Sequence, residues 1–493
     1  MEESKKSQMN SARSALIWAG GSQVIQDLAQ FVAMLFLVRL LSPADYGAMG
    51  LAQATFAIVT VFGPGVFVEH ALQVRNPDTV DWNSHWIFSI LLSSLLAVLL
   101  LLGAWFIAYD LVGLSVAIAL SCLACTVMLG ASSHVRNTYL HAHHQWARFR
   151  TLMLTGTGLG LCTGIAVAYA GYGVVALAVQ PALHVLPSAI DLFWSGFRPT
   201  KRFDRIYYQD VIKFGLNRLS VALLGAIRGF AEQGLITANF SLAVNGIYGR
   251  SIGLSNLLVG RFGAISVGSL YPILTRAERG SAAFRHNASR VLQGIAWIVI
   301  PAALFLSIEA KAIVALIYGD RWAGVVYLLP AAAAVTVTGA LHLTVSRLLL
   351  ANEARRASLA IDAVFGILSV AIAFWLLPKG PVPYLWALAI IGASSSVFGA
   401  SLLLWTRAIN LAGVARAIAP PLLSASIAIL CLHGVDSILV GLWSPLEVIM
   451  HAICFGLAYL FTLFALFRRT ASELILIVPG ISELAQRVKF KKI

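Results

Sequence analysis

Stretches of about 20 apolar residues recur along the whole 493-residue chain, each long enough to cross roughly 30 Å of hydrocarbon as an α-helix. Hydrophobic residues make up 59% of the chain and charged residues only 11%, which excludes an ordinary soluble protein. Inside a lipid bilayer every backbone N–H and C=O needs a partner within the protein, and a helix supplies it within one segment. The sequence therefore predicts an all-α, multi-pass membrane protein.

The apolar stretches predict about fourteen transmembrane helices. The first has a basic leader but is longer than the apolar core of a signal peptide, so we expect it to be retained. The predicted spans are residues 12–40, 46–73, 84–109, 113–140, 149–170, 174–197, 211–238, 245–272, 290–309, 322–350, 356–377, 384–405, 414–434 and 446–467.

The largest basic loop divides six predicted spans from the next six. We therefore expect an N-terminal lobe at 1–197, a basic cytoplasmic linker at 198–213 and a C-terminal lobe at 214–410. Two further helices would follow at 411–468, and a basic tail at 469–493. Two interpretations of the tail stay open: an interfacial segment attracted to anionic lipid, or a partly ordered end.

The formal net charge of +14 suggests at first a nucleic-acid partner. The Lys and Arg residues, however, gather in alternate loops between the apolar segments, which is the positive-inside pattern of membrane proteins. This pattern explains the charge without nucleic acid and predicts that both termini are cytoplasmic.

A short motif occurs twice, at Ser42–Gly50 (SPADYGAMG) and, 199 residues later, at Ser241–Gly249 (SLAVNGIYG). Ser, Ala, Gly and Gly recur at the same offsets, and each copy opens the second span of a six-span set. Because an offset of six spans preserves orientation, the two lobes are expected to be parallel repeats related by a pseudo-two-fold axis along the membrane normal.

Arg228 and Arg261 fall near the middle of the seventh and eighth predicted spans. A charge at the bilayer centre costs about 2.5–3.5 kcal/mol on insertion scales, so such residues normally face protein or water. Arg250 projects in nearly the same direction as Arg261, three helical turns away, and Arg218 lies toward the cytoplasm. Together they predict a cationic cavity that would suit a lipid diphosphate. The alternative is that Glu232, one turn from Arg228, neutralises it as a structural pair.

The first span carries four polar residues at spacings that place them on one helix face: Gln23, Gln26, Asp27 and Gln30. Two interpretations stay open. The face lines the cavity, with Asp27 touching substrate or coupling ion, or it forms an interhelical hydrogen-bond seam. Asp191 is a further candidate cavity residue, with a coupling or charge-balancing role as for Asp27 and Glu232. Snorkelling to the interface explains Arg136 adequately, and lining of the inner mouth is the alternative.

Other motifs predict no chemistry. The glycines of Gly156–Gly164 lack the preceding strand of a dinucleotide site, so close helix packing explains them. His141, His143 and His144 have no matching carboxylate or cysteine cluster, and no nucleophile–base pair or phosphate-binding loop stands out. We therefore expect neither an enzyme, nor a cofactor, nor a metal site.

Four segments resemble the polysaccharide-transporter branch of the multidrug/oligosaccharidyl-lipid/polysaccharide exporter superfamily. LVRLLSPADYGAMGLA (Leu37–Ala52) is similar to that family's first periplasmic turn, and GIYGRS (Gly246–Ser251) to its start of span eight. LYPILTR (Leu270–Arg276) resembles the exit of that helix, and LIYGDRW (Leu316–Trp322) the motif before span ten.

The resemblance implies two six-helix lobes with a cationic lumen that work by alternating access. It implies a bacterial inner-membrane flippase for undecaprenyl-diphosphate-linked oligosaccharides, serving exopolysaccharide, capsule or O-antigen assembly. H⁺ or Na⁺ would be the coupling ion, and a polysaccharide polymerase and co-polymerase would be partners. Glu232 is the nearest candidate for the acid that family members carry in span seven. The alternatives are an ion-coupled drug or cation antiporter of the same superfamily, a lipid II-type flippase, or a non-transport scaffold.

Overall fold

The computed structural model describes residues 2–260, 278, 281–439, 444–468 and 470–471, in part by backbone alone. The described residues form helices and turns and contain no strand, which confirms the predicted all-α fold. They divide into two compact units, Met1–Gly249 and Arg250–Ile493. The predicted division into lobes at 198–213 stays a prediction.

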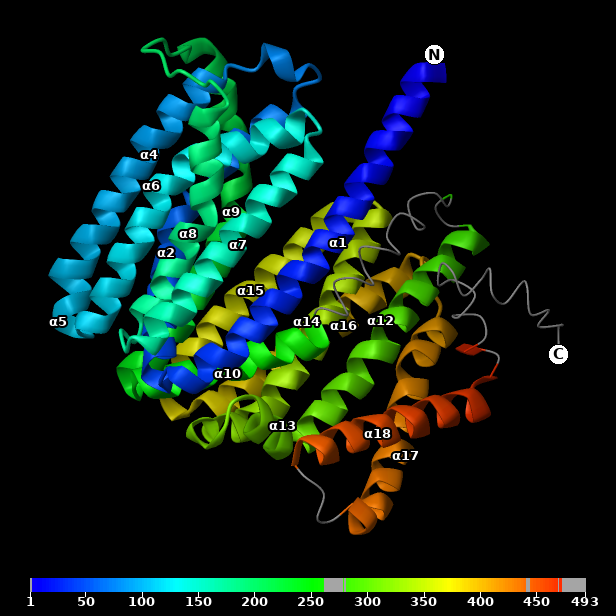
Figure 1. Ribbon diagram of the computed structural model, residues 1–493. Helices are drawn as coiled ribbons and strands as arrows, with labels where there is room; N and C mark the ends of the chain where they lie inside the picture. The colour runs from blue at the N-terminus through cyan, green and yellow to red at the C-terminus, as the bar shows by residue number, and fades with distance from the viewer. Residues whose placement is uncertain (1, 261–277, 279–280, 440–443, 469, 472–493) are drawn as a thin grey trace. The chain divides into compact units, whose positions relative to one another are not determined.

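The first unit holds ten α-helices within its described part (Figure 1), the last of them continuing into the second unit: α1 (Glu2–Leu40), α2 (Pro43–Val61), α3 (Pro64–Val68), α4 (Trp82–Gly103), α5 (Tyr109–Leu111), α6 (Leu114–Ala142), α7 (Trp146–Tyr169), α8 (Val175–Trp194), α9 (Arg205–Asn239) and α10 (Leu242–Ser255). Single turns η1 (Glu69–Gln73), η2 (Pro77–Thr79) and η3 (Ala104–Ala108) connect some of them. The helices α4, α6, α7 and α8 pack side by side, and α9 packs on α2.

The second unit continues from α10 through η4 (Asn256–Gly260). Its other described elements are α12 (Ala282–Ile308), α13 (Ala310–Ile317), η5 (Asp320–Trp322), α14 (Gly324–Ala351), α15 (Arg355–Leu376), η6 (Leu377–Lys379), α16 (Pro381–Trp405), α17 (Leu411–Leu439) and α18 (Ser444–Leu466). The helix α14 packs against α16 and α12, and α17 packs against α12 and α18 (Figure 1).

Eleven helices of the described part are long and apolar enough to cross a membrane, or up to twelve if the bent pair Pro43–Val61 and Pro64–Gln73 counts as one span. The predicted total of fourteen is therefore not reached by this measure. The two predicted spans outside this set are 211–238, where α9 lies, and 245–272, which runs into residues outside the described part.

Glycines allow α7 and α8 of the first unit to pack closely. A methyl group on Gly156 would overlap the carbonyl oxygen of His184, and one on Gly160 would lie 2.9 Å from that of Gln180. Since all four residues belong to α7 and α8, the interpretation of these glycines as helix-packing residues is confirmed.

The two copies of the repeated motif pack against each other. A methyl group on Gly47 of α2 would overlap the carbonyl oxygen of Leu242, and one on Gly246 of α10 would overlap that of Pro43. Pro43 and Leu242 occupy equivalent positions in the two copies, so the contact is reciprocal. Local two-fold symmetry gives this pattern, in which the same patch contributes from both sides. Both helices begin in the same way, with the Ser42 and Ser241 hydroxyls each accepting a backbone N–H three residues on.

Candidate functional site

Arg228 and Glu232 form an ion pair on α9, with Arg228 Nε 3.4 Å from Glu232 Oε1. The two side chains differ in exposure: 48% of Arg228 is accessible against 11% of Glu232. The other oxygen of the carboxylate, Glu232 Oε2, accepts the Tyr248 hydroxyl of α10 at 3.1 Å. Glu232 is thus anchored in the protein and holds the guanidinium at the helix surface. The pairing that the sequence left open is present.

The other predicted arginines are less completely described. The side chain of Arg218 and the whole of Arg261 lie outside the described residues. Arg250 is half-buried on α10, and its carbonyl oxygen accepts the Tyr318 hydroxyl at 3.4 Å. Burial raises the pKa of Tyr318 to about 12, and the nearby charge of Arg250 opposes part of that increase. The phenol therefore stays a hydrogen-bond donor at neutral pH.

The polar face of α1 is divided between two environments. Gln26 donates to the Thr157 hydroxyl of α7 at 2.9 Å, and Thr157 Oγ1 lies 3.2 Å from His184 Nδ1 of α8. This part of the face is an interhelical seam. Gln23 is exposed and donates to Asp27 at 3.0 Å, and Gln30 is exposed as well. Asp27 is half-buried. The role of this face in a cavity stays a prediction.

Asp191 lies between two arginines of neighbouring helices. Arg136 Nε on α6 donates to Asp191 Oδ2 at 2.6 Å, and Arg148 Nη2 on α7 donates to Asp191 Oδ1 at 2.6 Å. Arg136 is only 3% exposed, so its interpretation as a snorkelling residue is wrong. The carboxylate makes burial of this charge possible, and the guanidinium also lies over the Tyr139 ring. Such a fully engaged carboxylate ties α6, α7 and α8 together.

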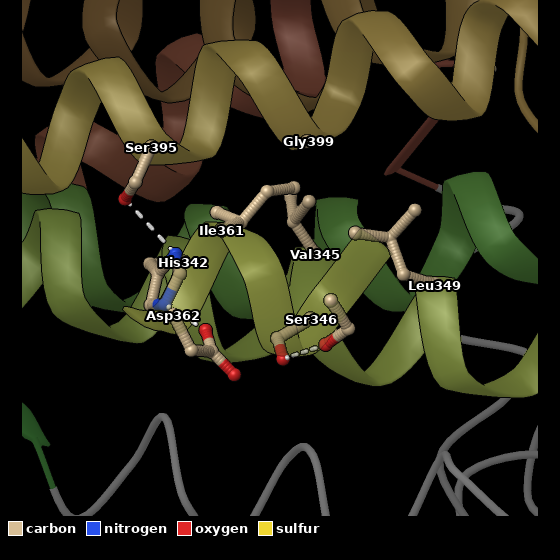
Figure 2. Close-up of a pocket in the computed structure, with 9 residues that line it drawn as sticks. His342, Val345, Ser346, Leu349, Ile361, Asp362, Ser395 and Gly399 are labelled. Carbon is tan, nitrogen blue, oxygen red and sulfur yellow. Dashed lines mark hydrogen bonds and ion pairs between the residues drawn. The ribbon is translucent and has the colours of Figure 1, made fainter. Parts of the chain in front are cut away.

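A polar cluster in the second unit was not predicted from the sequence. His342 on α14 contacts Asp362 on α15 through Nε2 (2.9 Å to Oδ1) and Ser395 on α16 through Nδ1 (2.9 Å to Oγ). Figure 2 shows the imidazole ring between these two partners in a small pocket, with the Ser346 hydroxyl nearby. Three helices contribute, so no sequence spacing could have revealed the cluster. The signal available was an ionisable residue inside an apolar span.

Within the described residues there is no group of three or more His, Cys, Asp or Glu side chains placed to hold a metal ion. The pockets and ion pairs are instead built from arginine, histidine and carboxylate side chains in helices that are otherwise apolar. Such side chains can bind ions or charged head groups.

A family described as polysaccharide biosynthesis protein matches residues 36–327, more than half of the chain. The chain belongs to this family. The match includes the repeated motif, Arg228 and the LIYGDRW segment. It confirms the resemblance drawn from the sequence, and no curated protein matches the chain.

Two solved structures share the fold. A lipid II flippase, MurJ in an inward closed conformation, aligns with a TM-score of 0.75 and 12% identity over 92% of this chain and 99% of that one. An inward-facing multidrug resistance MATE transporter of the MOP superfamily aligns with a TM-score of 0.58 and 17% identity, over 80% and 97% of the two chains. At these identities the likeness concerns the fold. These two neighbours are a flippase and a transporter, and neither is an enzyme.

Proposed function

We propose that the protein is a flippase that carries undecaprenyl-diphosphate-linked oligosaccharide repeat units across the bacterial inner membrane. The product would feed exopolysaccharide, capsule or O-antigen assembly. Membership of a polysaccharide biosynthesis family supports the sugar part of this proposal, and the flippase-like fold supports the lipid part. Both termini would face the cytoplasm, as the distribution of Lys and Arg predicts.

The observation that carries the proposal is the geometry of Arg228. Its contact with Glu232 uses Nε, and nearly half of the side chain is accessible. A guanidinium has further N–H donors beyond Nε, arranged in a fork that matches phosphate oxygens. Because Glu232 is held by Tyr248, the guanidinium has a fixed base from which to meet a diphosphate.

In this mechanism the diphosphate binds at Arg228, with Arg261 contributing positive charge at a similar predicted depth and Arg250 and Arg218 at other depths. The polyprenyl tail stays in the lipid, and the oligosaccharide crosses through the polar interior. Asp27, Gln23 and Gln30 of α1 are the proposed contacts for sugar hydroxyls. The polysaccharide polymerase and co-polymerase would take over the product on the opposite side.

The direct test measures translocation in proteoliposomes that contain an undecaprenyl-diphosphate-linked oligosaccharide. A membrane-impermeant lectin reports the fraction of sugar on the outer leaflet over time. We expect Arg228→Gln to slow translocation about tenfold or more, because a charge-assisted hydrogen bond is worth about 1.5–3 kcal/mol. Arg205→Gln, at the exposed start of the same helix, is the matched control and should leave the rate unchanged.

Three outcomes would contradict the proposal. Wild-type rates in Arg228→Gln would remove the arginine from the mechanism. Export of a cationic dye in place of the lipid-linked sugar would favour a drug antiporter. Translocation of lipid II as well as, or in place of, the oligosaccharide lipid would move the assignment to a lipid II-type flippase.

A further inference from the structure

The cluster around His342 lies where α15 and α16 both contact α14 in the second unit. On α14 and α15, His342 pairs with Asp362 while Ser346 pairs with Ser358 at 2.8 Å. The two pairs are spaced by one helical turn on each antiparallel helix, so they form two rungs between the same faces. Close packing of Gly392 and Gly399 against α14 brings α16 near, and these glycines lie on either side of Ser395.

The hydrogen bonds of this cluster can be completed in two protonation states of His342. With a proton on both ring nitrogens, Nε2–H donates to Asp362 and Nδ1–H donates to Ser395 Oγ, whose own hydroxyl donates to the Gly392 carbonyl at 2.9 Å. When the Nδ1 proton leaves, the Ser395 hydroxyl can rotate and donate to Nδ1. The Gly392 carbonyl then keeps the Ser396 hydroxyl, which donates to it at 2.8 Å. No heavy atom has to move, and no polar group loses its last partner.

The accessibility of the cluster distinguishes it from the other buried ion pairs in the described spans. The side chains of His342 and Asp362 are 27% and 38% exposed, against 4% and 10% for Arg136 and Asp191. A second histidine–carboxylate pair of this unit, His451 with Glu309 at the end of α12, is 8% and 11% exposed. The His342 pair is therefore the most open of these three ion pairs, as proton exchange requires.

The charge of the pocket is determined by His342 and Asp362. Among the residues that line the pocket, His342 and Asp362 alone are titratable. The elements packed against α14 carry other charged or titratable residues in their described parts, but none of these lines the pocket, nor do Tyr327 and Arg347 of α14 itself. Those residues are Arg285, His286 and Arg290 of α12, Lys311 of α13, Asp320 and Arg321 of η5, and Arg355 and Arg356 of α15; the titratable residue of α16 is Tyr384.

We propose that His342 is a proton-binding site in the second unit, in which Asp362 holds the ring through Nε2 and Nδ1 takes up and releases one H⁺. The loaded site is a neutral imidazolium–carboxylate pair. The empty site carries one negative charge inside an apolar span, which is costly unless water or a cation faces it. Binding of the proton would thus favour conformations of the protein in which this pocket is closed to water. The group that changes charge is the Nδ1 ring nitrogen, which Ser395 engages in both states, so the ligand taken up there is the proton.

Proton binding itself can be tested without any transported molecule. The full-length protein is labelled with ¹⁵N-histidine in lipid nanodiscs, and the His342 signals are identified by their loss in His342→Asn. We expect Nδ1 of His342 to change from unprotonated to protonated as the buffer is taken from about pH 8 to about pH 5, while Nε2 stays protonated. Ser346→Ala, which removes the neighbouring rung and no titratable group, should show the same change. A His342 signal that does not change over this range would overturn the site.

The role of this proton in transport rests on the proposed function. In proteoliposomes, exchange of one H⁺ per lipid-linked sugar predicts that a pH difference of about one unit shifts the steady-state leaflet ratio of the sugar about tenfold. His342→Asn should abolish that shift, and Ser346→Ala should retain it. Wild-type translocation that ignores the pH difference would overturn the coupling. Absence of wild-type translocation would instead contradict the proposed function and leave the nanodisc result to decide the proton site.

Discussion

The two copies of the repeated motif, Ser42–Gly50 and Ser241–Gly249, show how similar sequences take on different tasks. Both begin with a capping serine, and Gly47 and Gly246 lie against each other's helix backbones. The copies then diverge. In the first, Asp45 completes a capping box with Ser42, whereas the second has Val244 at that position.

The last glycines of the two copies, Gly50 and Gly249, also have different surroundings. A methyl group on Gly50 would lie 2.7 Å from Gln233 Oε1, whereas one on Gly249 would meet nothing within 4 Å. In the second copy, Asn245 instead reaches across to donate to the Gly47 carbonyl at 3.1 Å. The shared glycines Gly47 and Gly246 therefore serve the close helix approach, whereas the residues that differ act from one copy only: Asp45 caps its own helix, and Asn245 joins the two copies. Substitutions can separate these two classes.

The largest effect is expected at the two facing glycines. Gly47→Ala or Gly246→Ala places a methyl group on a backbone carbonyl that belongs to a rigid helix. We expect each to destabilise the protein by about 3 kcal/mol or more, at the upper end for overpacked sites. Thermal unfolding of the purified protein in detergent measures this loss. Similar midpoints for the wild type and both variants would show that the helices do not approach in this way.

A smaller loss is expected at Asn245. Asn245→Ala removes the hydrogen bond to the Gly47 carbonyl and leaves a buried acceptor, at a cost of about 1–3 kcal/mol. Asn239→Ala is the matched control, because Asn239 is exposed and bonds within its own helix. Equal unfolding temperatures for these two variants would contradict a role for Asn245 in joining the copies.

The capping box of the first copy is expected to contribute less. Asp45→Ala and Ser42→Ala should each cost about 0.5–2 kcal/mol, the usual range for an N-cap. Since both residues belong to one box, the double variant should cost clearly less than the two single losses added together. Additive losses in a thermal unfolding series would argue that Ser42 and Asp45 act independently.

The smallest effect, and of opposite sign, is expected at Gly249. Because the position is helical and open, Gly249→Ala should stabilise the protein by about 0.5–1 kcal/mol. Gly50→Ala meets the end of a flexible glutamine side chain, so the helix gain is offset and we expect little net change. A large loss in Gly249→Ala would mean that another surface packs on this glycine.

Several features could be predicted from particular residues. The apolar stretches determined the helical fold, and the spacing of four residues between Arg228 and Glu232 made their pairing one of two open alternatives. The seam formed by Gln26 was likewise one of two interpretations. Arg136 could not be interpreted correctly, because its partner Asp191 lies 55 residues away on another helix. The cluster of His342, Asp362 and Ser395 was missed for the same reason.

By itself, the sequence determined the membrane-spanning helices, the family and the existence of a repeated motif, because periodicity, hydropathy and local spacing are properties of one segment at a time. Only the tertiary structure decided that the two motif copies face each other and which charges are neutralised. Those outcomes depend on which helix surfaces meet. In the sequence, Gly47 shows only that a side chain is absent. The tertiary structure shows that the backbone of the second copy, at Leu242, fills that space.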